Sequence, residues 1–526
     1  MPCVRAAWRP ERIARRERGR ERSGAAGPAA AVAGILVRAW DAQRIARAAG
    51  AELVRDRALA DEPPRSSPEP GPLGATIDSR DIAPGDLFVG LAGERVDGGA
   101  YAAASLEAGA WGALVAPAHA RALAGEALPG AVLAHPDPLA GLQALGRAWR
   151  EELGRRGAKV VAVTGSTGKT STKDILAALL GGHLRTVSSP QNLNTEIGLP
   201  LAILGAPAGT QALVLEMAMR GPGQIAELTA IAAPDVGVIV NVGPAHLELL
   251  GSIEAIAAAK AELIDGLQAG TTVVVPAGEP LLEGHLRSDL RTLSFGAGGD
   301  VELAGQSEDG TVEIRHGERH MTLSPSFRGA HNLQNLLAAV AAASALGVFH
   351  EGPLEVRFSG LRGERRTLPG GVLLIDDCYN ANPMSMRAAI DELAETGAAR
   401  RVAVLGDMLE LGADAPRFHR EVGEHAAARG IELLVTVGPL AAGIRDGYEG
   451  EAHSVADAPA AAELLTGLLR DGDAVLVKGS RGVGLERVAE SLLAPAGGSR
   501  WQDAGERPAG LVGERPVVPG GRPGRR

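Results

Sequence analysis

Short apolar runs alternate along the chain with longer stretches in which apolar residues recur every three or four positions. Runs rich in β-branched residues predict buried strands, and the longer spacing predicts helices that bury one face. In the middle of the chain, strands are predicted at residues 159–164, 212–216, 236–241 and 272–276, with helices at 171–180, 253–267 and 332–345. This alternation favours a parallel sheet that is covered on both faces.

Two further blocks flank this central one. The first block predicts strands at 76–80, 87–91 and 113–116, a turn at 84–86 and a helix at 100–109. The last block predicts strands at 372–375, 402–405, 433–437 and 474–477, with helices between them. We therefore predict an α/β protein of three domains: a small α/β domain at 36–155, a parallel-sheet domain at 156–352 and a Rossmann-like domain at 353–495.

The two ends of the chain lack this periodicity. Residues 1–22 contain eight arginines and three glutamates, and an apolar stretch rich in Ala and Gly follows at 24–37. A secretory signal peptide has this order, but Pro28 interrupts the stretch, so we predict a disordered extension over 1–35, or translation from an upstream start codon. A tail rich in Gly, Pro and Arg is predicted to be disordered over 496–526. We expect no transmembrane helix, because no other run approaches 18 apolar residues.

Composition narrows the classes of function. The 526 residues carry a formal net charge of -10, which argues against a general nucleic-acid or anionic-membrane binder. Cys3 and Cys378 are the two cysteines, which excludes a disulfide scaffold and agrees with a reducing compartment, so a cytoplasmic location is expected. We interpret Cys378 as a small buried apolar residue rather than a reactive thiol.

The strongest local motif is a phosphate loop between the strand at 159–164 and the helix at 171–180. It reads Thr-Gly-Ser-Thr-Gly-Lys-Thr over 164–170, a shortened Walker A pattern in which Val163 stands where a glycine is usual. Glycines allow backbone N–H groups to face phosphate oxygens at a helix N-terminus, Lys169 supplies positive charge, and Thr170 offers a hydroxyl to Mg²⁺. The predicted ATP contacts are therefore Gly165, Ser166, Thr167, Gly168, Lys169 and Thr170.

Three later residues bear on the same chemistry. Glu216 ends a buried strand, where open α/β sheets bind ligands and a carboxylate suits Mg²⁺. His246 follows another strand, and its position fits a metal ligand, a phosphate contact or an ordinary surface histidine. Lys260 lies in an alanine-rich helix, and the pattern alone predicts a solvated side chain.

These residues occur in a set of motifs that resembles the Mur ligases of peptidoglycan synthesis over residues 36–493. The motifs are Thr-Gly-Ser-Thr-Gly-Lys-Thr (164–170), Asn-Leu-Asn-Thr-Glu-Ile-Gly (192–198), Glu216, Ala-His-Leu-Glu (245–248), Ala-Lys (259–260) and His-Asn (331–332). The stretches at 376–383, 385–386, 405–412 and 478–481 are most similar to the branch of this family that adds D-alanyl-D-alanine. The Asp-Asn-Pro-Arg motif usual in the branch that adds the third peptide residue is not found.

The resemblance implies an activity and a set of small molecules. It implies ATP-dependent amide bond formation between UDP-N-acetylmuramoyl-tripeptide and D-alanyl-D-alanine, through an acyl phosphate. ATP and Mg²⁺ are the implied cofactors, and a monomer without nucleic-acid partner or membrane insertion is expected. The implied domain roles are a UDP-substrate-binding domain at 36–155, an ATP-binding domain at 156–352 and a ligase domain at 353–495.

The resemblance also implies roles for individual residues. Lys260 would be carbamylated and would bind metal through an anionic oxygen, together with Thr170, Glu216 and His246. Lys169, Lys260, His246 and Arg362 are the implied catalytic residues, and the further ATP contacts would be His331, Asn332, Arg362 and Asp377. The UDP-linked substrate would meet Ser79, Arg80, Asn192, Asn194 and Thr195. The dipeptide would meet Tyr379, Asn380, Asn382 and Asp407.

The chain departs from the family pattern at two places. The N-terminal motif, usually Asp-Gly-His-x-Phe, reads Asp-Gly-Gly-Ala-Tyr over 97–101, and the usual Pro-Gly-Arg reads Gly-Leu-Arg over 360–362. Arg365 and Arg366 are therefore close alternatives to Arg362. Other functions left open are a related ligase of the third-residue or folylpolyglutamate type, a P-loop switch and an inactive binding homologue. The third residue of the tripeptide, meso-diaminopimelate or lysine, is also open.

Overall fold

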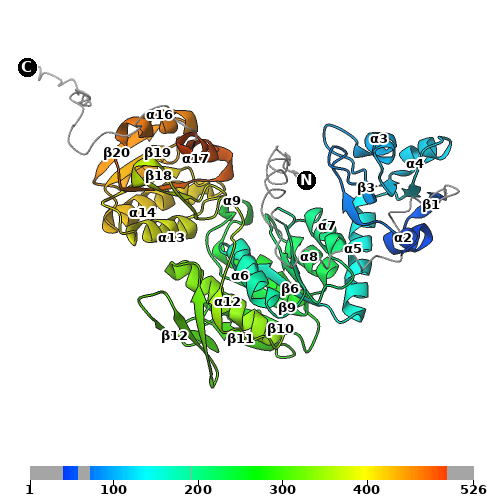
Figure 1. Ribbon diagram of the computed structural model, residues 1–526, viewed down its shortest axis with the longest axis horizontal. Helices are drawn as coiled ribbons and strands as arrows, with labels where there is room; N and C mark the ends of the chain where they lie inside the picture. Colours follow the sequence, from blue (N-terminus) through cyan, green and yellow to red (C-terminus); the bar gives the residue numbers. More distant parts are fainter. Residues whose placement is uncertain (1–39, 57–70, 191, 494–526) are drawn as a thin grey trace, which may run out of the picture. The chain divides into compact units, whose positions relative to one another are not determined.

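A computed structural model describes residues 40–56, 71–190 and 192–493 (Figure 1). The predicted extension at 1–35, the tail at 496–526 and Cys3 lie outside these residues. The chain divides into two compact units. The first runs to Gly360 and includes Glu410–Asp414, and the second comprises Leu361–Leu409 and the residues from Ala415 onward. No helix within the described ranges is both long and apolar enough to cross a membrane.

The first sheet has the strand order β1-β5-β4-β3-β2 and is parallel except for the β1–β5 pair. Its strands are β1 (Glu52–Arg55), β2 (Gly74–Thr76), β3 (Asp86–Val89), β4 (Gly112–Val115) and β5 (Ala131–Ala134). The helical segments of this part are α2 (Ala42–Ala49), η3 (Gly98–Tyr101), α3 (Ala102–Glu107), α4 (Pro117–Ala124) and α5 (Pro138–Arg155). The strand predicted at 76–80 ends at Thr76, because the Asp78 carboxylate accepts the Arg80 N–H and turns the chain.

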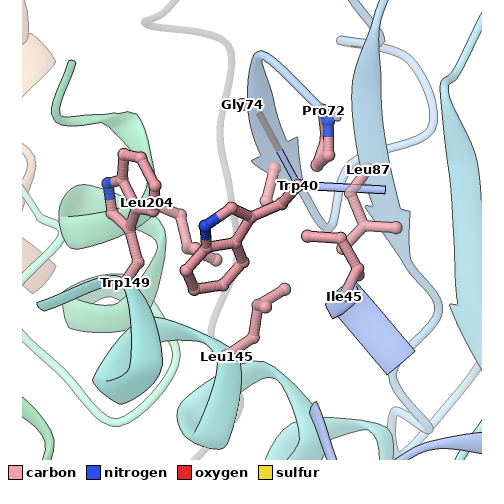
Figure 2. A pocket seen from close by; sticks show the side chains of 9 residues that line it. Trp40, Ile45, Pro72, Gly74, Leu87, Leu145, Trp149 and Leu204 are labelled. Carbon is pink, nitrogen blue, oxygen red and sulfur yellow. The ribbon is translucent and has the colours of Figure 1, made fainter. Parts of the chain in front are cut away.

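The aromatic residues are few, but two tryptophans join the first sheet to the helices that follow it. The rings of Trp40 and Trp149 meet edge to face with centroids 5.3 Å apart. Figure 2 shows them beside a small apolar pocket lined by Ile45, Leu87, Leu145 and Leu204, among others. Because Leu204 belongs to α7 (Gly198–Gly205) of the next sheet's helical layer, one continuous core holds the first unit together.

The second sheet has ten strands in the order β15-β14-β13-β12-β11-β10-β9-β6-β8-β7. Its strands are β6 (Lys159–Thr164), β7 (Thr186–Ser188), β8 (Ala212–Glu216), β9 (Val236–Ile239), β10 (Thr272–Pro276), β11 (Arg291–Phe295), β12 (Val301–Gln306), β13 (Val312–His316), β14 (Arg319–Pro325) and β15 (Gly352–Leu354). Its other helices are α6 (Lys169–Gly181), α8 (Gln224–Ala232), α9 (Leu247–Leu250), α10 (Ile253–Gly266), α11 (Pro280–Glu283) and α12 (Ala330–Ala345). Helices α6 and α12 cover one face, and α7, α8 and α10 cover the other.

The predicted parallel pairing holds for β7 to β12, and the sheet then continues in a way the sequence analysis did not predict. β12, β13 and β14 pair antiparallel. In β13, Val312 and Ile314 are buried whereas Glu313 between them is exposed. This alternation is typical of antiparallel strands with one solvated face.

The third sheet has the order β16-β17-β21-β18-β19-β20 and is parallel except for the β16–β17 pair. Its strands are β16 (Glu364–Thr367), β17 (Leu373–Asp376), β18 (Arg400–Gly406), β19 (Leu433–Val437), β20 (Glu451–Val455) and β21 (Asp473–Lys478). The helical segments are η4 (Pro369–Gly371), α13 (Pro383–Ala394), η5 (Gly412–Asp414), α14 (Ala415–Ala428), α15 (Ala442–Asp446), α16 (Ala458–Leu468), η6 (Arg481–Val483) and α17 (Glu486–Leu493). The predicted α/β class is confirmed. The carboxyl ends of β17, β18 and β21 share one edge, where open sheets bind ligands.

Candidate active site

The phosphate loop joins the buried strand β6 to helix α6, as the sequence predicts. Gly168 precedes the helix with a φ of +76°, a conformation that favours glycine. A Cβ at this position would lie 2.4 Å from the Oδ1 atom of Asn335, which is buried in α12. The close approach of α12 therefore requires glycine at this turn.

Asn241, two residues after β9, supports the loop from the side. Its Oδ1 accepts hydrogen bonds from the backbone N–H groups of Ser166 (3.1 Å) and Thr167 (3.0 Å), and its Nδ2 donates to the Thr167 carbonyl. The Ser166 hydroxyl donates to the Gly243 carbonyl at 2.8 Å. The loop is thereby held in a single conformation before any phosphate binds.

Two of the predicted metal ligands meet beside the loop. The Thr170 hydroxyl donates to the Glu216 carboxylate at 2.7 Å, and both side chains are buried. The other oxygen of Glu216 accepts from Asn194 Nδ2 at 2.9 Å. Lys169 Nζ donates to the Gly165 carbonyl at 2.9 Å. The structure therefore links Asn194, predicted to meet substrate, directly to a predicted metal ligand.

Lys260 is buried, in contrast to the solvated side chain that the helix pattern alone predicts. Lys260 lies in α10 and is 2% exposed. Burial holds the pKa of its ammonium group well below the usual value, and the positive charge of Lys169 lowers that pKa further. Within the described ranges, no hydrogen bond or ion pair satisfies this amine. A buried neutral amine is the form that adds carbon dioxide, so the site fits a carbamate.

His246 begins helix α9 with a φ of +59°. Its Nδ1–H donates to the Glu410 carboxylate at 2.5 Å, and this hydrogen bond lowers the pKa of Glu410 from its usual value. No cluster of three or more His, Cys, Asp or Glu side chains in the described part of the chain forms a metal site unaided. Of the four predicted ligands, the structure joins Thr170 to Glu216 by a hydrogen bond, and a hydroxyl and a carboxylate are oxygen donors of the kind that Mg²⁺ prefers.

The predicted adenine contacts lie at the start of α12. Asn332 Nδ2 donates to the Arg328 carbonyl at 3.3 Å, and its Oδ1 accepts from Asn335 Nδ2 at 3.4 Å. Since Asn335 packs against Gly168, Asn332 is connected through one side chain to the phosphate loop. His331 precedes it on the same helix.

The residues predicted to meet the UDP-linked substrate fall into two groups. Arg80 forms an exposed ion pair with Asp78 at 2.7 Å, and Ser79 lies in the same turn. Asn192, with a φ of +70°, and Thr195, whose Oγ1 accepts the Gly198 N–H at 3.4 Å, precede α7.

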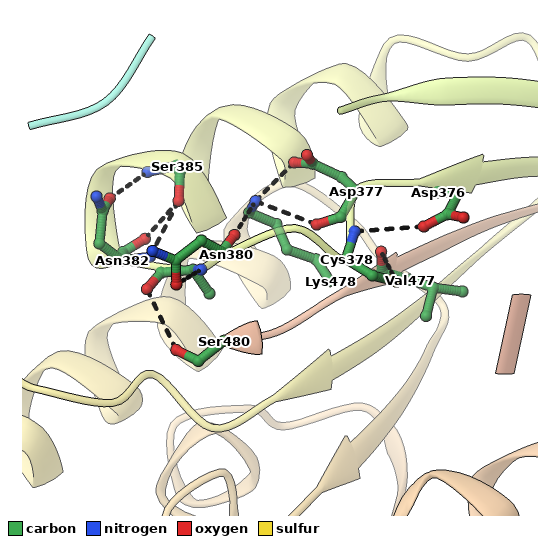
Figure 3. Close-up of polar contacts among 10 residues, drawn as sticks. Asp376, Asp377, Cys378, Asn380, Asn382, Ser385, Val477, Lys478 and Ser480 are labelled. Atoms are coloured by element: carbon green, nitrogen blue, oxygen red, sulfur yellow. Dashed lines mark hydrogen bonds and ion pairs between the residues drawn. The ribbon is translucent and has the colours of Figure 1, made fainter. Parts of the chain in front are cut away.

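In the second unit, the segment after β17 is held by β21. Lys478, only 2% exposed, donates to Asp377 Oδ2 at 2.6 Å and to the Asn380 carbonyl at 2.9 Å (Figure 3). Asn382 caps α13, and its Oδ1 accepts the Ser385 N–H at 2.9 Å. The predicted ribose contact Asp377 and the dipeptide contacts Asn380 and Asn382 therefore lie on one ordered loop.

The structure distinguishes the three candidate arginines. Arg365 is paired with Glu392 and Arg366 with Glu364, each at 2.6 Å. The Arg362 guanidinium instead stacks on the Tyr379 ring, 4.1 Å from its centroid, and its buried Nε has no partner among the described residues. This difference favours Arg362 as the arginine available to an anionic ligand.

Comparisons with known proteins agree with this geometry. Three family profiles match: the Mur ligase family catalytic domain at 74–140, the Mur ligase middle domain at 163–343 and the Mur ligase, glutamate ligase domain at 361–481. The Bacillus subtilis UDP-N-acetylmuramoyl-tripeptide–D-alanyl-D-alanine ligase is 37% identical over 433 residues, covering 80% of this chain and 93% of the relative. This chain belongs to the Mur ligase family.

Other relatives and solved Mur ligases extend the match. The Escherichia coli ligase of the same name is 33% identical over 439 residues, which cover 79% of this chain and 93% of that protein. MurF from Acinetobacter baumannii aligns with a TM-score of 0.73 at 28% identity, covering 87% of this chain and 100% of its own. MurF from Thermotoga maritima in complex with ADP aligns with a TM-score of 0.68 at 32% identity, covering 80% and 96%.

Three residues that contact the predicted site of this Mur ligase were not predicted from the sequence. Asn241, Asn335 and Glu410 each contact the predicted site through a side chain from a distant part of the chain. Asn241 had a usable signal, because it ends the strand predicted at 236–241, where open α/β sheets bind ligands. Asn335 and Glu410 had none, since one lies within an alanine-rich helix and the other in a loop.

In the last domain of this Mur ligase, the buried side chain of His419 supports the backbone next to Asp407. Asp407 Oδ1 accepts the Ala441 N–H at 2.7 Å. The next residue, Met408, donates its N–H to His419 Nε2 at 3.0 Å, while His419 Nδ1–H donates to the Ala415 carbonyl at 2.7 Å. Only the neutral ring can accept the Met408 N–H at Nε2 while it donates from Nδ1, and burial lowers the pKa of His419 from its usual value of 6.5.

The pH dependence of stability should report this histidine. Because the folded-state pKa is depressed, the contribution of His419 is present above pH 6.5 and is lost as the pH falls through the lower folded value. We expect His419→Leu to cost about 1–3 kcal/mol of unfolding free energy at pH 8, and less below pH 6. Urea unfolding at both pH values measures this, with the exposed His320→Leu as control. A difference that is independent of pH would contradict the assignment.

The interpretation of Cys378 is confirmed. Its side chain is buried and its Sγ–H donates to the Val477 carbonyl at 3.3 Å (Figure 3). Burial raises the pKa of the thiol well above its usual value. The thiolate that nucleophilic chemistry requires is therefore disfavoured, and Cys378 acts as a packing residue.

Proposed function

We propose that this chain is an ATP-dependent ligase that joins D-alanyl-D-alanine to UDP-N-acetylmuramoyl-tripeptide, a step of peptidoglycan precursor synthesis. The observation that carries this proposal is the 37% identity to ligases of that name across 93% of the Bacillus subtilis relative. The phosphate loop, the ordered segment at Asp377–Asn382 and the ADP complex of the Thermotoga maritima neighbour support the use of ATP.

The reaction proceeds in two steps. The terminal carboxylate of the tripeptide attacks the γ-phosphorus of ATP, so that a new P–O bond forms, the bond to ADP breaks and an acyl phosphate results. The amino group of D-alanyl-D-alanine then attacks the acyl carbon, the amide bond forms, and inorganic phosphate leaves. Phosphoryl transfer needs mainly positioning and charge stabilisation, which Lys169, the amides of the phosphate loop and Arg362 supply.

Mg²⁺ belongs to the proposal as the partner of ATP. Thr170, Glu216, His246 and Lys260 as its carbamate would hold it, and when bound it would offset negative charge on the phosphates. Hydrogen bonds from Thr170 and Asn194 to the Glu216 carboxylate orient two of these metal ligands, Thr170 and Glu216, before the metal binds. Asn194 thereby connects the substrate loop to the metal ligands.

The remaining contacts are assigned by position. His331 and Asn332 would meet the adenine, and Asp377 the ribose. Ser79 and Arg80 would bind the UDP end of the substrate, and Asn192 and Thr195 its muramoyl-peptide. Tyr379, Asn380, Asn382 and Asp407 would bind the dipeptide, and the protein would act as a cytoplasmic monomer.

A phosphate-release assay with varied amine substrates tests this function. We expect ATP-dependent release with UDP-N-acetylmuramoyl-tripeptide and D-alanyl-D-alanine together, and a new amide product by mass spectrometry. Running the meso-diaminopimelate and lysine tripeptides in parallel identifies the third residue. Single amino acids and folates test the related ligases, and greater turnover with either would overturn the proposal. Release that is independent of any amine would point to an NTPase switch.

A further inference from the structure

A short segment of the last domain belongs, by its packing, to the first compact unit. Glu410–Asp414 is flanked in sequence by Leu361–Leu409 and by the residues from Ala415 onward, all of which belong to the second unit. The Glu410 carbonyl accepts the Glu248 N–H at 3.1 Å, and a Cβ at Gly412 would lie 3.3 Å from the Glu248 Cα. The segment is thus seated beside α9, the helix that His246 begins.

The two residues that meet there are both held in an unusual backbone conformation. Among the described residues, five non-glycine residues have a positive φ: Asn192, Ala233, His246, Leu361 and Glu410. His246 and Glu410 have φ values of +59° and +63°, and their side chains form the 2.5 Å hydrogen bond. An ordinary surface ion pair needs no such geometry on either partner. Backbone strain of this kind persists where the surrounding structure requires it, and it gathers at functional sites.

The hydrogen bond also fixes which ring nitrogen is available. Because Nδ1–H donates to Glu410, the neutral His246 ring carries its lone pair on Nε2. Histidines that bind metal ions commonly donate their other N–H to a carboxylate, which fixes the tautomer and the ring orientation. The His246 side chain is partly exposed, at 23%.

We propose that Glu410 is a positioning residue that orients His246 to bind metal through Nε2. This inference rests on the metal site of the proposed function. Its consequence is that the ATP-binding half of the chain relies on a residue from a loop that interrupts the ligase domain in sequence. The loop between β18 and α14 thus supplies a part of the metal site.

Glu410→Gly separates this role from a structural one. Glycine adopts a φ of +63° without steric strain, and the variant retains the backbone carbonyl that accepts the Glu248 N–H. The variant should therefore be as stable as the parent protein or more so. It lacks the carboxylate, and Mn²⁺ should bind the protein with the non-hydrolysable analogue of ATP about 10–100-fold more weakly. Mn²⁺ binding is measured by electron paramagnetic resonance, and stability by thermal unfolding. Ala233→Gly, with a φ of +41° outside the site, is the matched control and should leave Mn²⁺ affinity unchanged.

A double-mutant cycle links the effect to His246. His246→Ala should weaken Mn²⁺ binding, and adding Glu410→Gly to it should cause no further loss. If Glu410→Gly alone retains parental affinity while His246→Ala loses it, the positioning role is overturned and the metal site stands. If His246→Ala itself retains affinity, the metal site fails and the inference fails with it. Glu410→Gln, which keeps a neutral acceptor, should fall between the parent and the glycine variant.

Discussion

Lys169→Ala should reduce the rate of ATP-dependent phosphate release by about 10²–10³-fold or more. The lysine begins α6 beside the glycines of the phosphate loop, and its Nζ lies 2.9 Å from the Gly165 carbonyl. Loss of a preorganised charge at a transferring phosphoryl group removes transition-state stabilisation of this order. Steady-state phosphate release with both substrates present measures the effect.

The control for this variant is Lys159→Ala. Lys159 begins β6, the strand that leads into the phosphate loop, but it is largely exposed and pairs with Asp235. Its replacement should therefore leave turnover within about twofold, as expected of a surface pair. Full ligation by Lys169→Ala would refute the mechanism. Equal losses in both variants would indicate damage to β6 rather than to the site.

Replacing Lys260 by alanine should have the second large effect, also about 10²–10³-fold on turnover, because it removes a buried group that we propose as a metal ligand and whose pKa the charge of Lys169 lowers. Burial keeps the pKa of this amine well below its usual value, which favours the neutral form that adds carbon dioxide. With ¹³C-labelled bicarbonate, the parent protein should show a carbamate resonance that Lys260→Ala lacks.

Carbon dioxide removal provides an independent measurement. Activity should fall in degassed, bicarbonate-free buffer and return when bicarbonate is added, whereas Lys260→Ala should not respond. Lys159→Ala should keep both the resonance and the response. A parent protein that shows neither would exclude the carbamate.

The sequence located the phosphate loop because every part of that loop is local. A β-branched run, two glycines, a lysine and a helix follow one another within 25 residues, and the structure places β6 and α6 where the pattern predicts them. Glu216 was found for a related reason, since it ends a buried strand of a parallel sheet. Asn335 and Glu410 were missed, because Glu410 lies 164 residues from His246 and no local pattern records such a meeting.

Two ambiguities were decided by tertiary packing. Three arginines at 362–366 are equivalent by spacing, and only the ion pairs of Arg365 and Arg366 set Arg362 apart. Likewise, the antiparallel pairing of β12, β13 and β14 depends on which strands lie next to each other in the folded sheet. The alternation of apolar and polar residues in β13 was present in the sequence but does not specify those neighbours.

By itself, the sequence determined the α/β class, the alternation of strands and helices in each block, and the strand–loop–helix form of the phosphate loop. These follow from local periodicity and from the conformational freedom of glycine, which neighbouring residues control. Only the tertiary structure decided that Lys260 is buried and that Glu410 reaches His246. Desolvation and long-range hydrogen bonds depend on all the elements that pack around a group, so they arise only when the chain has folded.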